Sequence, residues 1–440
     1  MMTNTTRIPD TDKPRIVVIG GGFGGLELIK ALKKVDAQIV LFDKQNHHTF
    51  QPLLYQVATS GLETASIVYP FRKAFGKLRN FYFRLGKVIQ INPEDKYLET
   101  SIGGLHYDYL VIATGADSNY YGLEDIAQHS LPIKTIEDAI LLRNRIIKQF
   151  ELALLTDDDE KKNSLIDYVI VGGGPTGVEI AGALAELKKH VLPKDYKELD
   201  FYEMDIHLIE AAPRLLTAMA EESSERAYED LKKMGVDVRL NTSVKSYDGY
   251  TVTFNSGEQL ITRTLIWAAG VAGVPIKGLE KANIVRGNRL QVDEFNKVIG
   301  YDNIFAVGDV AAMITDETPK GHPMMAPPAM QQGRNLAKNL IRMIKGDIDL
   351  NPFKYFDKGS MATIGRNKAV VNMKGLKMKG FIAWLAWMFI HLIFLVGFKK
   401  RVQVLITWIT SYFSYDKSNR LIIGKPTIEE KQPEKISISS

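Results

Sequence analysis

Two glycine-rich stretches carry the clearest chemistry in this chain. One reads Gly-Gly-Gly-Phe-Gly-Gly over residues 20–25, and the other reads Gly-Gly-Gly-Pro-Thr-Gly over residues 172–177. Each follows a short apolar run and opens a helix-compatible stretch, which is the pattern of a dinucleotide-binding turn. Such a turn needs one glycine for its sharp bend, one for close approach of a pyrophosphate, and one for packing a helix on a strand. Those glycines are Gly20, Gly22, Gly25, Gly172, Gly174 and Gly177.

Each fingerprint is followed by another apolar run that ends in an acid. Asp43 ends the strand predicted for residues 38–43, and Glu210 ends the strand predicted for residues 206–210. An acid at this place accepts hydrogen bonds from ribose hydroxyls, and Glu210 would repel a 2′-phosphate, so the sequence favours NADH over NADPH. Arg214 is close enough to weaken that preference, although a helix-start residue is its simpler interpretation. The chain is therefore predicted to hold two dinucleotides, most simply a flavin and a nicotinamide.

The chain has no cysteine. Disulfides, thiolate metal sites and iron–sulfur clusters are excluded, as are flavoenzymes that react through a cysteine pair. His47 and His48 are adjacent, but no carboxylate stands at ligand spacing, so we expect no metal site. The formal charge of +5 is mild, and basic residues crowd toward the C-terminal third. An anionic membrane surface is therefore a better partner than nucleic acid.

The order of the apolar runs places one nucleotide domain inside another. The first domain is interrupted after a strand predicted at 107–116 and resumes near residue 290, with a strand at 303–309. A helix is predicted at 26–34, and the charged run at 157–162 is predicted as a solvated loop. The expected fold is α/β, with two Rossmann-like dinucleotide-binding domains, one inserted in the other, and a C-terminal membrane-associating helical segment. The predicted boundaries are 14–120 and 290–350 for the outer domain, 165–285 for the inner domain, 351–425 for the C-terminal region and 429–440 for a disordered tail.

The C-terminal region contains an apolar segment at residues 381–398, interrupted only by His391. As a helix it would reach roughly 27 Å, just under a hydrocarbon core of about 30 Å. Lysines flank both ends of this segment. The segment therefore lacks the charge asymmetry that is typical of a spanning helix, and it suits attachment at one anionic surface. Residues 402–413 form a second apolar stripe, and Trp384, Trp387 and Trp408 fit an interfacial belt. Monotopic attachment is favoured, a buried core or dimer helix is the alternative, and a spanning helix is least favoured.

Taken together, these residues resemble the two-dinucleotide-binding flavoproteins, and among them the type II NADH dehydrogenases, which are single-subunit NADH:quinone oxidoreductases. The resemblance covers about residues 14–420 and is most specific at 46–59, 264–271 and 359–365. It implies an FAD enzyme that oxidises NADH and gives two electrons to membrane quinone without pumping ions. It further implies a peripheral protein at the cytoplasmic face of the cell membrane, with a second copy of the chain as a candidate partner.

The resemblance also assigns binding residues for both dinucleotides. The residues implied for FAD are Gly20, Gly21, Gly22, Phe23, Gly24, Gly25, Asp43, Lys44, Val88, Thr114, Gly115, Asp309, Ala326 and Pro327. Those implied for NADH are Gly172, Gly174, Gly177, Glu210 and Gly270.

Two further residues are candidates for catalysis. Glu179 lies in the first turn of the helix after the second fingerprint, where the helix dipole favours an anion. By resemblance it faces the nicotinamide and the flavin and handles protons. Gln331 matches the second glutamine of the family's Ala-Gln-x-Ala-x-Gln signature, which implies contact with quinone, whereas Pro327 replaces the first. Proline lacks an N–H, so one hydrogen bond to a quinone or flavin carbonyl is lost or comes from elsewhere.

Other readings stay open at this point. Glu179 could simply stabilise its helix, and Gln331 could face solvent. A soluble NAD(P)H-dependent flavoprotein reductase that feeds a small electron-transfer protein would keep both fingerprints, but the apolar C-terminal segment argues against it. A nucleotide-binding redox sensor without turnover would also keep them, and steady NADH oxidation with a quinone would exclude it.

Overall fold

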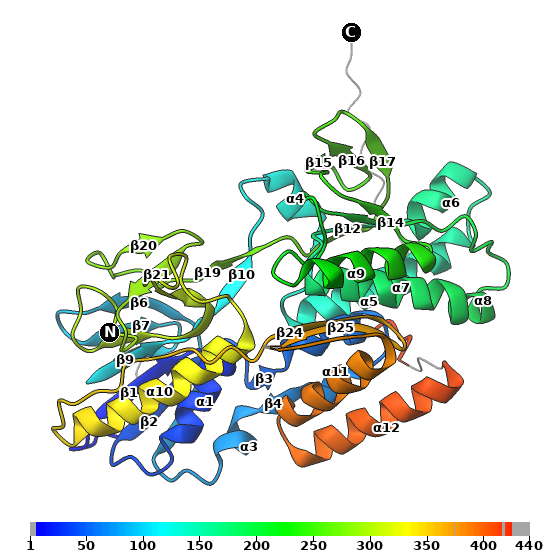
Figure 1. Ribbon diagram of the computed structural model, residues 1–440. Helices are drawn as coiled ribbons and strands as arrows, with labels where there is room; N and C mark the ends of the chain where they lie inside the picture. Colours follow the sequence, from blue (N-terminus) through cyan, green and yellow to red (C-terminus); the bar gives the residue numbers. More distant parts are fainter. Residues whose placement is uncertain (1–5, 374, 416–418, 425–440) are drawn as a thin grey trace.

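The computed structural model describes residues 6–373, 375–415 and 419–424 of the chain. Figure 1 shows two α/β lobes side by side, with a hairpin of two C-terminal helices beneath the second lobe. The tail predicted for 429–440 lies outside the described residues.

The first lobe is built on a parallel five-stranded sheet in the order β22-β9-β1-β2-β5. Its strands are nearly continuous apolar runs because helices cover them, as a parallel sheet requires. The strands are β1 (Arg15–Ile19), β2 (Gln38–Asp43), β5 (Phe81–Leu85), β9 (Tyr109–Ile112) and β22 (Ile304–Ala306). Since β22 comes from far along the chain, the backbone leaves this sheet after β9 and returns, which confirms that one nucleotide fold is inserted in the other.

Two helices cover one side of this sheet, and they pack very closely against each other. They are α1 (Phe23–Ala31) and α10 (Ala326–Ile344), drawn side by side in Figure 1. A Cβ atom added to Gly333 would lie 2.3 Å from the carbonyl oxygen of Gly24. The missing side chain therefore lets the helix after the fingerprint and the helix of residues 326–344 touch through their backbones.

The second lobe repeats the plan with a five-stranded parallel sheet in the order β11-β18-β12-β13-β14. Its strands are β11 (Leu131–Pro132), β12 (Tyr168–Val171), β13 (Ile206–Ile209), β14 (Asp237–Arg239) and β18 (Leu265–Trp267). The associated helices are α4 (Glu124–His129), α5 (Ile136–Ala153), α6 (Asp159–Ile166), α7 (Pro175–His190), α8 (Leu192–Asp195) and α9 (Glu221–Lys233).

Small sheets and short helices complete the lobes. One antiparallel pair, β10 (Ala116–Ser118) with β19 (Val271–Gly273), runs between the lobes. The other strands are β3 (His47–Thr49) with β4 (Val68–Pro70); β6 (Val88–Asn92), β7 (Tyr97–Thr100) and β8 (Gly103–His106); β15 (Val244–Tyr247), β16 (Thr251–Phe254) and β17 (Gln259–Ile261); and β20 (Ile284–Val285), β21 (Arg289–Val292) and β23 (Ala311–Met313). The short helices are α2 (Leu54–Ala58) and α3 (Phe71–Phe75), with single 3₁₀ turns at Gln51–Leu53, Thr64–Ser66 and Gly308–Val310.

The C-terminal region is an antiparallel three-stranded meander followed by two helices. The elements are β24 (Ser360–Gly365), β25 (Lys368–Met373), β26 (Leu376–Lys379), α11 (Gly380–Phe394) and α12 (Phe398–Ser414). β24 packs on α7 and β25 packs on α11, so the meander joins the second lobe to the helical hairpin.

Three local predictions were inaccurate. The helix expected at 26–34 begins earlier, at Phe23, because the chain turns directly into a helix after the fingerprint glycines. The strand expected at 107–116 is divided into β9 and β10. The charged run at 157–162 is not all loop, since α6 begins at Asp159 after Asp158, which accepts a hydrogen bond from the backbone N–H of Lys161 at 3.1 Å.

Candidate functional site

The two fingerprints have the same backbone geometry. Gly20 and Gly172 have φ angles of +101° and +113°, which side chains rarely tolerate. A Cβ atom on Gly25 would lie 2.0 Å from the carbonyl oxygen of Gly20, and one on Gly177 would lie 1.8 Å from that of Gly172. The predicted roles of the first and third glycines therefore agree with the structure, since the turn is tight and each helix starts against its own strand.

The middle glycine of each fingerprint borders open space. An added Cβ on Gly22 or Gly174 would meet no atom within 4 Å. Each residue is the N-cap of its helix, α1 or α7, and neither cap makes a side-chain hydrogen bond. The first backbone N–H groups of both helices are thus available to an anion, and the local geometry fits a pyrophosphate.

A carboxylate stands beside each fingerprint. The backbone N–H of Gly21 donates to Oδ2 of Asp43 at 2.6 Å, and that of Gly173 donates to Oε2 of Glu210 at 2.5 Å. Burial raises the pKa of Asp43 above its usual value, against backbone hydrogen bonds that lower it. Asp43 ends β2, and Glu210 directly follows β13, so both acids stand where the ribose position requires them.

Arg214 does not begin a helix. Its guanidinium donates to the carbonyl oxygens of Thr217 and Met219, both at 3.0 Å, and to Oγ of Ser224 at 2.7 Å. The next helix, α9, starts only at Glu221. Arg214 therefore fastens the turn that precedes α9.

Asp309 lies at a half-buried position after β22 with cations on one side. Lys134 Nζ is 3.8 Å from its Oδ2. Burial raises the pKa of Asp309, and the charges of Lys134 and Arg289 oppose that rise. The adjacent backbone N–H of Gly308 donates to Oε1 of Gln332 at 2.8 Å. Sequence reasoning missed Gln332, a buried α10 residue that fixes the turn carrying Asp309.

Other predicted FAD residues gather around the same edge of the first sheet. Thr114 Oγ1 donates to the carbonyl oxygen of Val274 at 2.6 Å, which ties this edge to the residue that directly follows β19. A Cβ on Gly115 would meet nothing within 4 Å, so its surroundings are open. Ala326 and Pro327 form the first turn of α10. Their contact with a flavin stays a prediction.

The remaining predicted residues lie in varied surroundings. Val88 is buried at the start of β6, whereas Lys44 is exposed after β2. Gly270 has a φ of +82°, and a Cβ there would lie 2.0 Å from Oη of Tyr121. Gly270 therefore forms a tight turn just before β19.

His48 is buried directly behind the first fingerprint. Its Nδ1 is 3.0 Å from the carbonyl oxygen of Gly21, and its ring meets Phe23 edge to face with the centroids 5.0 Å apart. Burial lowers the pKa of His48 to about 4, so the imidazole is neutral at pH 7. Its Nε2 is buried without a hydrogen-bond partner. Across the ranges that the structure describes, no group of three or more His, Cys, Asp or Glu could hold a metal ion.

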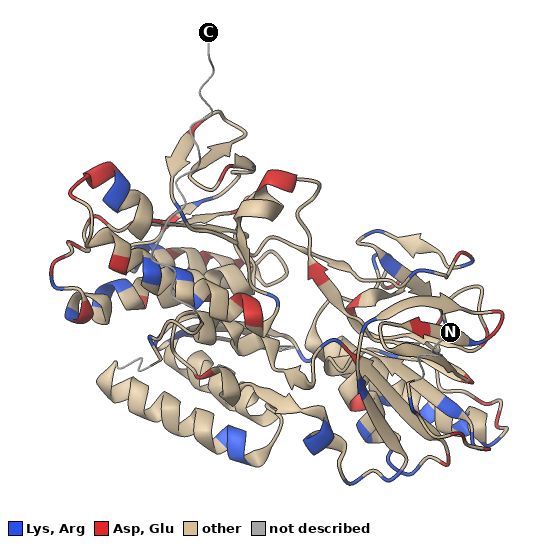
Figure 2. Ribbon diagram, turned by 180° about the vertical axis from the view of Figure 1, so that it is seen from behind, with Lys and Arg blue, Asp and Glu red and all other residues tan. Residues whose placement is uncertain are grey.

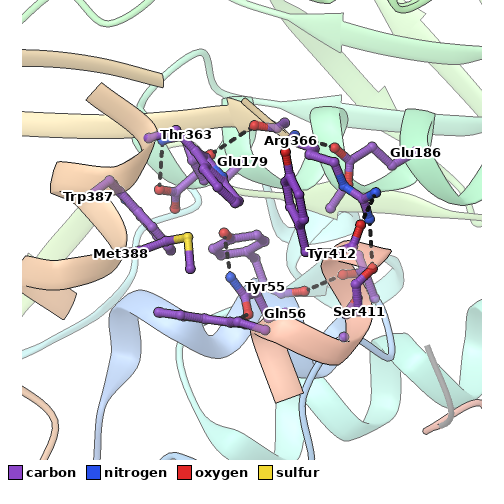
Figure 3. Close-up of a pocket in the computed structure, with 16 residues that line it drawn as sticks. Tyr55, Gln56, Glu179, Glu186, Thr363, Arg366, Trp387, Met388, Ser411 and Tyr412 are labelled. Atoms are coloured by element: carbon purple, nitrogen blue, oxygen red, sulfur yellow. Dashed lines mark hydrogen bonds between the residues drawn. The ribbon is translucent and has the colours of Figure 1, made fainter. Parts of the chain in front are cut away.

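Glu179 is the fifth residue of α7, so its predicted place in the first turn of the helix is wrong, because the helix already begins at Pro175. Its side chain points into a pocket of about 110 Å³ (Figure 3). The second lobe contributes α7, the first lobe contributes α2, and the C-terminal region contributes β24, α11 and α12. The lining residues are Tyr55, Gln56, Thr59, Gly61, Glu179, Ala183, Glu186, Thr363, Gly365, Arg366, Trp384, Trp387, Met388, Trp408, Ser411 and Tyr412.

The carboxyl group of Glu179 is held in a mostly apolar setting. Burial raises its pKa to about 8, opposed in part by the backbone N–H of Thr363, which donates to Oε1 at 3.4 Å. The indole N–H of Trp387 also faces the carboxyl, although outside regular hydrogen-bond geometry. Glu179 is therefore largely protonated at pH 7, and this acid can both give and accept a proton.

One side of the pocket is a hydrogen-bonded aromatic wall that sequence reasoning missed. Nε1 of Trp408 donates to Oε1 of Gln56 at 2.8 Å, and Nε2 of Gln56 donates to Oη of Tyr55 at 2.9 Å. Trp387 packs on Trp408, with ring centroids 5.8 Å apart. The interfacial belt predicted for the tryptophans is wrong for these two, which are 1% and 9% exposed.

Arg366 fixes the far end of α12 at the pocket. Its guanidinium donates to the carbonyl oxygens of Ser411 and Tyr412 at 2.8 and 2.7 Å, where the last turn of a helix has unpaired acceptors. Its backbone N–H also donates to Glu186 of α7. One arginine thus connects the meander, the second lobe and the hairpin.

Gln331 does not line the pocket that holds Glu179. Its Nε2 donates to the carbonyl oxygen of Phe356 at 2.9 Å, and the backbone N–H of Phe356 donates back to Oε1 at 3.0 Å. Both ends of the amide therefore fasten the segment that returns along α10. The predicted contact between Gln331 and quinone stays a prediction.

The hairpin presents apolar side chains on its outer face. On α11 and α12 the exposed ones are Phe381, Ile382, Leu385, Phe389, Ile393, Phe398, Val402, Leu405, Ile406, Ile409 and Phe413. Within the described residues, none of the helices has the length and apolar character needed to cross a bilayer. So continuous an exposed apolar face is typical of an interaction surface.

Comparison with known proteins agrees with this arrangement. The family of pyridine nucleotide-disulphide oxidoreductases matches residues 14–333, and the NDH2 C-terminal domain matches residues 358–414. Among curated proteins, two type II NADH:quinone oxidoreductases of Mycobacterium tuberculosis, Ndh and NdhA, are 35% and 37% identical. The match covers 95% of this chain and 91% of Ndh, and 93% of this chain and 90% of NdhA. The solved structure of NDH2 from Plasmodium falciparum with NADH has the same fold, with a TM-score of 0.85, 22% identity, and 94% of this chain and 100% of that one covered.

Proposed function

Because this chain belongs to the type II NADH:quinone oxidoreductases, we propose that it oxidises NADH and reduces a membrane quinone by two electrons, with FAD as its resident cofactor. The observation that carries the proposal is the pocket around Glu179, where both nucleotide lobes meet the C-terminal hairpin. The absence of cysteine in the chain fits direct electron transfer between the two nucleotide carriers and quinone.

The residues of the first lobe fit FAD. The open approach at Gly22, the uncapped start of α1 and the carboxylates of Asp43 and Asp309 suit a pyrophosphate, a ribose and a ribityl chain. Bound FAD supplies the capacity to accept a hydride from NADH and to give up two electrons to quinone. The protein holds and orients the partners of that exchange.

The second lobe fits NADH by the same physical argument. Gly174 leaves room for phosphate at the start of α7, and Glu210 is held at the ribose position by the backbone N–H of Gly173. A negative charge there disfavours the additional phosphate of NADPH. Preference for NADH follows from these two residues.

Glu179 is proposed to handle the proton that accompanies quinone reduction. Its carboxyl opens into the pocket beside Tyr55 and Trp387, and burial keeps a proton on it at pH 7. The apolar wall supplied by the hairpin excludes water around this proton and offers an apolar approach for a quinone ring.

The outer face of the hairpin is proposed to lie in one leaflet of the cell membrane, on the cytoplasmic side. The inner face of α11 and α12 lines the pocket while the outer face is apolar and exposed. The hairpin would thus connect the bilayer, where quinone is dissolved, with the pocket of Glu179. A homodimer is a further proposal, and it would need a surface other than this membrane-facing one.

The deciding experiment measures NADH and NADPH oxidation by the purified yellow protein with and without quinone. The proposal expects rapid NADH oxidation that depends on added quinone, with NADPH much slower. A protein that reduces a small electron-transfer protein but no quinone would support the soluble reductase instead.

A further inference from the structure

A second cavity, of about 430 Å³, lies at the turn between α11 and α12. Its walls come from α1, α10, the edge of β4 and the residues 393–397 of the hairpin turn. This cavity does not include Glu179, and none of the residues predicted for FAD or NADH lines it. It therefore needs an explanation separate from the electron-transfer site.

The polar lining of this cavity is predominantly cationic. Lys30 of α1, Arg334 of α10 and Arg401 of α12 are brought together from three helices. Glu27 is the carboxylate of the lining, and it pairs with Lys30 at 3.0 Å and with Arg334 at 2.6 Å. Three cations and one carboxylate leave the cavity positive, which suits an anion.

The hairpin turn is held in place against the first lobe. Gly397 has a φ of +93°, and a Cβ there would lie 2.4 Å from the ring of Tyr69. Nε of Arg401 donates to the carbonyl oxygen of Leu395 at 2.8 Å. The turn that forms one wall of the cavity is therefore held by contacts within the protein itself.

More positive charge surrounds the entrance. Lys73 lies 5.6 Å from the ring centre of Tyr69, and Lys399 and Lys400 open α12. Burial lowers the pKa of Lys400, and the charges of Lys399 and Lys73 lower it further, against Glu63, which raises it. Figure 2 shows α3 and the start of α12 as neighbouring blue segments. The field at this end of the hairpin is thus positive.

An apolar track leads directly away from the cavity. Ile393 lines it, and the exposed side chains of Phe389, Leu385 and Ile382 continue from there along α11. A small hydrophilic anion would leave this track unused. A ligand with an anionic head and hydrocarbon chains would use both.

We propose that this cavity binds the phosphodiester headgroup of an anionic phospholipid, with an acyl chain along Ile393 and Phe389. The Nε and Nη2 atoms of Arg334 are engaged by Glu27, and Nε of Arg401 is engaged by Leu395. The two Nη groups of Arg401 therefore supply the paired donors that match phosphate oxygens, while Arg334 and Lys30 add positive charge that Glu27 offsets in part. The inference builds on the membrane attachment proposed above and adds lipid selectivity to it. The lipid would anchor the hairpin turn and keep the inner face of the helices over the pocket of Glu179.

Binding is tested on the full-length, flavin-loaded protein with short-chain phosphatidylglycerol below its micelle concentration. Calorimetry should give saturable binding, at least tenfold weaker for short-chain phosphatidylcholine and for inorganic phosphate. The variant Lys30→Gln with Arg401→Gln should weaken phosphatidylglycerol binding at least tenfold. The matched control, Lys33→Gln with Arg79→Gln, removes two exposed cations that do not line the cavity and should change binding less than twofold.

Equal affinity for the two lipids, equal affinity for free phosphate, or equal weakening in both double variants would overturn the proposal. Flavin absorbance and NADH oxidation with a water-soluble acceptor show whether the variants are folded, and the milder Arg401→Lys variant should lose about threefold. Binding to vesicles distinguishes the proposed headgroup site from membrane attachment in general. If the protein binds vesicles of phosphatidylcholine and of phosphatidylglycerol equally, attachment stands and the headgroup site fails, whereas no vesicle binding at all contradicts attachment.

Discussion

Gly182 of α7 touches the backbone of Ile364 in β24 so closely that no side chain fits between them. A Cβ atom at residue 182 would lie 1.7 Å from the carbonyl oxygen of Ile364. Glu179 is one helical turn earlier, and its carboxyl oxygen accepts from Thr363, the neighbour of Ile364. The distance between α7 and β24 therefore sets the position of Glu179 relative to the hairpin.

The variant Gly182→Ala tests this contact. On helix propensity alone, alanine should stabilise α7 by about 1 kcal/mol. Because its methyl group would force β24 away, we expect a net loss of about 1–3 kcal/mol instead. Thermal unfolding gives the sign, and stopped-flow measurements should show slower quinone reduction with little change in flavin reduction by NADH. A more stable, fully active variant would contradict the argument.

The variant Glu179→Gln replaces the titratable carboxyl group in the pocket by an amide of nearly the same shape, which cannot transfer a proton near neutral pH. FAD loading and NADH binding should be preserved, and quinone reduction should fall by about 10²-fold, the lower end of general acid–base contributions. The pH profile of quinone reduction should lose its inflection near pH 8, where burial places the pKa of Glu179. An unchanged rate and profile would leave Glu179 with a structural role only.

The same group makes folding stability depend on pH. Burial raises the pKa of Glu179 from 4.5 to about 8, so between these values the folded protein keeps a proton that the unfolded chain releases. Stability is therefore lost as pH rises through this window. Glu179→Gln should flatten the fall in Tm between pH 5 and 8 by a few degrees, measured against wild type in the same buffers.

Local patterns in the sequence predicted the parts of the fold that depend on local chemistry. Gly20 and Gly172 adopt positive φ, and Asp43 and Glu210, predicted as the acids that end the next apolar runs, stand beside their fingerprints. These features arise within one strand–helix–strand unit, so a limited window of sequence is enough to identify them. Helix limits were less accurate, because a capping residue such as Asp158 converts a charged run into a helix start.

The pocket around Glu179 could not be predicted from local sequence patterns. Tyr55 and Trp387 are brought together from opposite ends of the chain, and their rings lie 6.4 Å apart. α11 is apolar on nearly every side, so its sequence does not separate the buried Trp387 from the exposed Phe389. Only the packing of α11 against the meander and α12 decides which side faces the pocket.

Glu210→Gln tests cofactor choice. The neutral amide keeps the shape beside Gly173 but removes the charge that repels a 2′-phosphate. Two unit charges about 4 Å apart repel each other by about 1 kcal/mol in water-like surroundings. The ratio of kcat/KM for NADPH over NADH should therefore rise about fivefold. If wild type already uses both cofactors equally, the role given to Glu210 is wrong.

Gln331→Ala separates a quinone contact from a structural one. We expect slower quinone reduction with flavin reduction by NADH nearly unchanged, together with a stability loss of about 1–2 kcal/mol from two lost hydrogen bonds to Phe356. Asn335→Ala is the control, because Asn335 fastens the same returning segment at Asn351 with a 3.0 Å bond one turn further along α10. Equal kinetic effects in both variants, or equal loss in both half-reactions, would mean that Gln331 acts through the fold.

The outer face of the hairpin allows membrane attachment to be tested without disturbing the pocket. Phe389 of α11 is 64% exposed and Ile406 of α12 is 55% exposed, and neither lines the cavity around Glu179. Removing α11 and α12 altogether would be less informative, because that change would also remove Trp387 and Trp408 from the core. Serine at both exposed positions deletes apolar surface worth about 1.5–3 kcal/mol per side chain when buried in lipid.

The double variant Phe389→Ser with Ile406→Ser should move from the membrane to the soluble fraction and keep its FAD. It should reduce a short-chain soluble quinone at the wild-type rate, because the inner face of the hairpin is intact, but lose most activity with long-chain quinone in liposomes. Leu155→Ser with Ile348→Ser is the matched control, since these side chains are 73% and 95% exposed but lie outside the hairpin. A double variant that stays on the membrane and remains fully active with liposomal quinone would show that another surface makes the attachment.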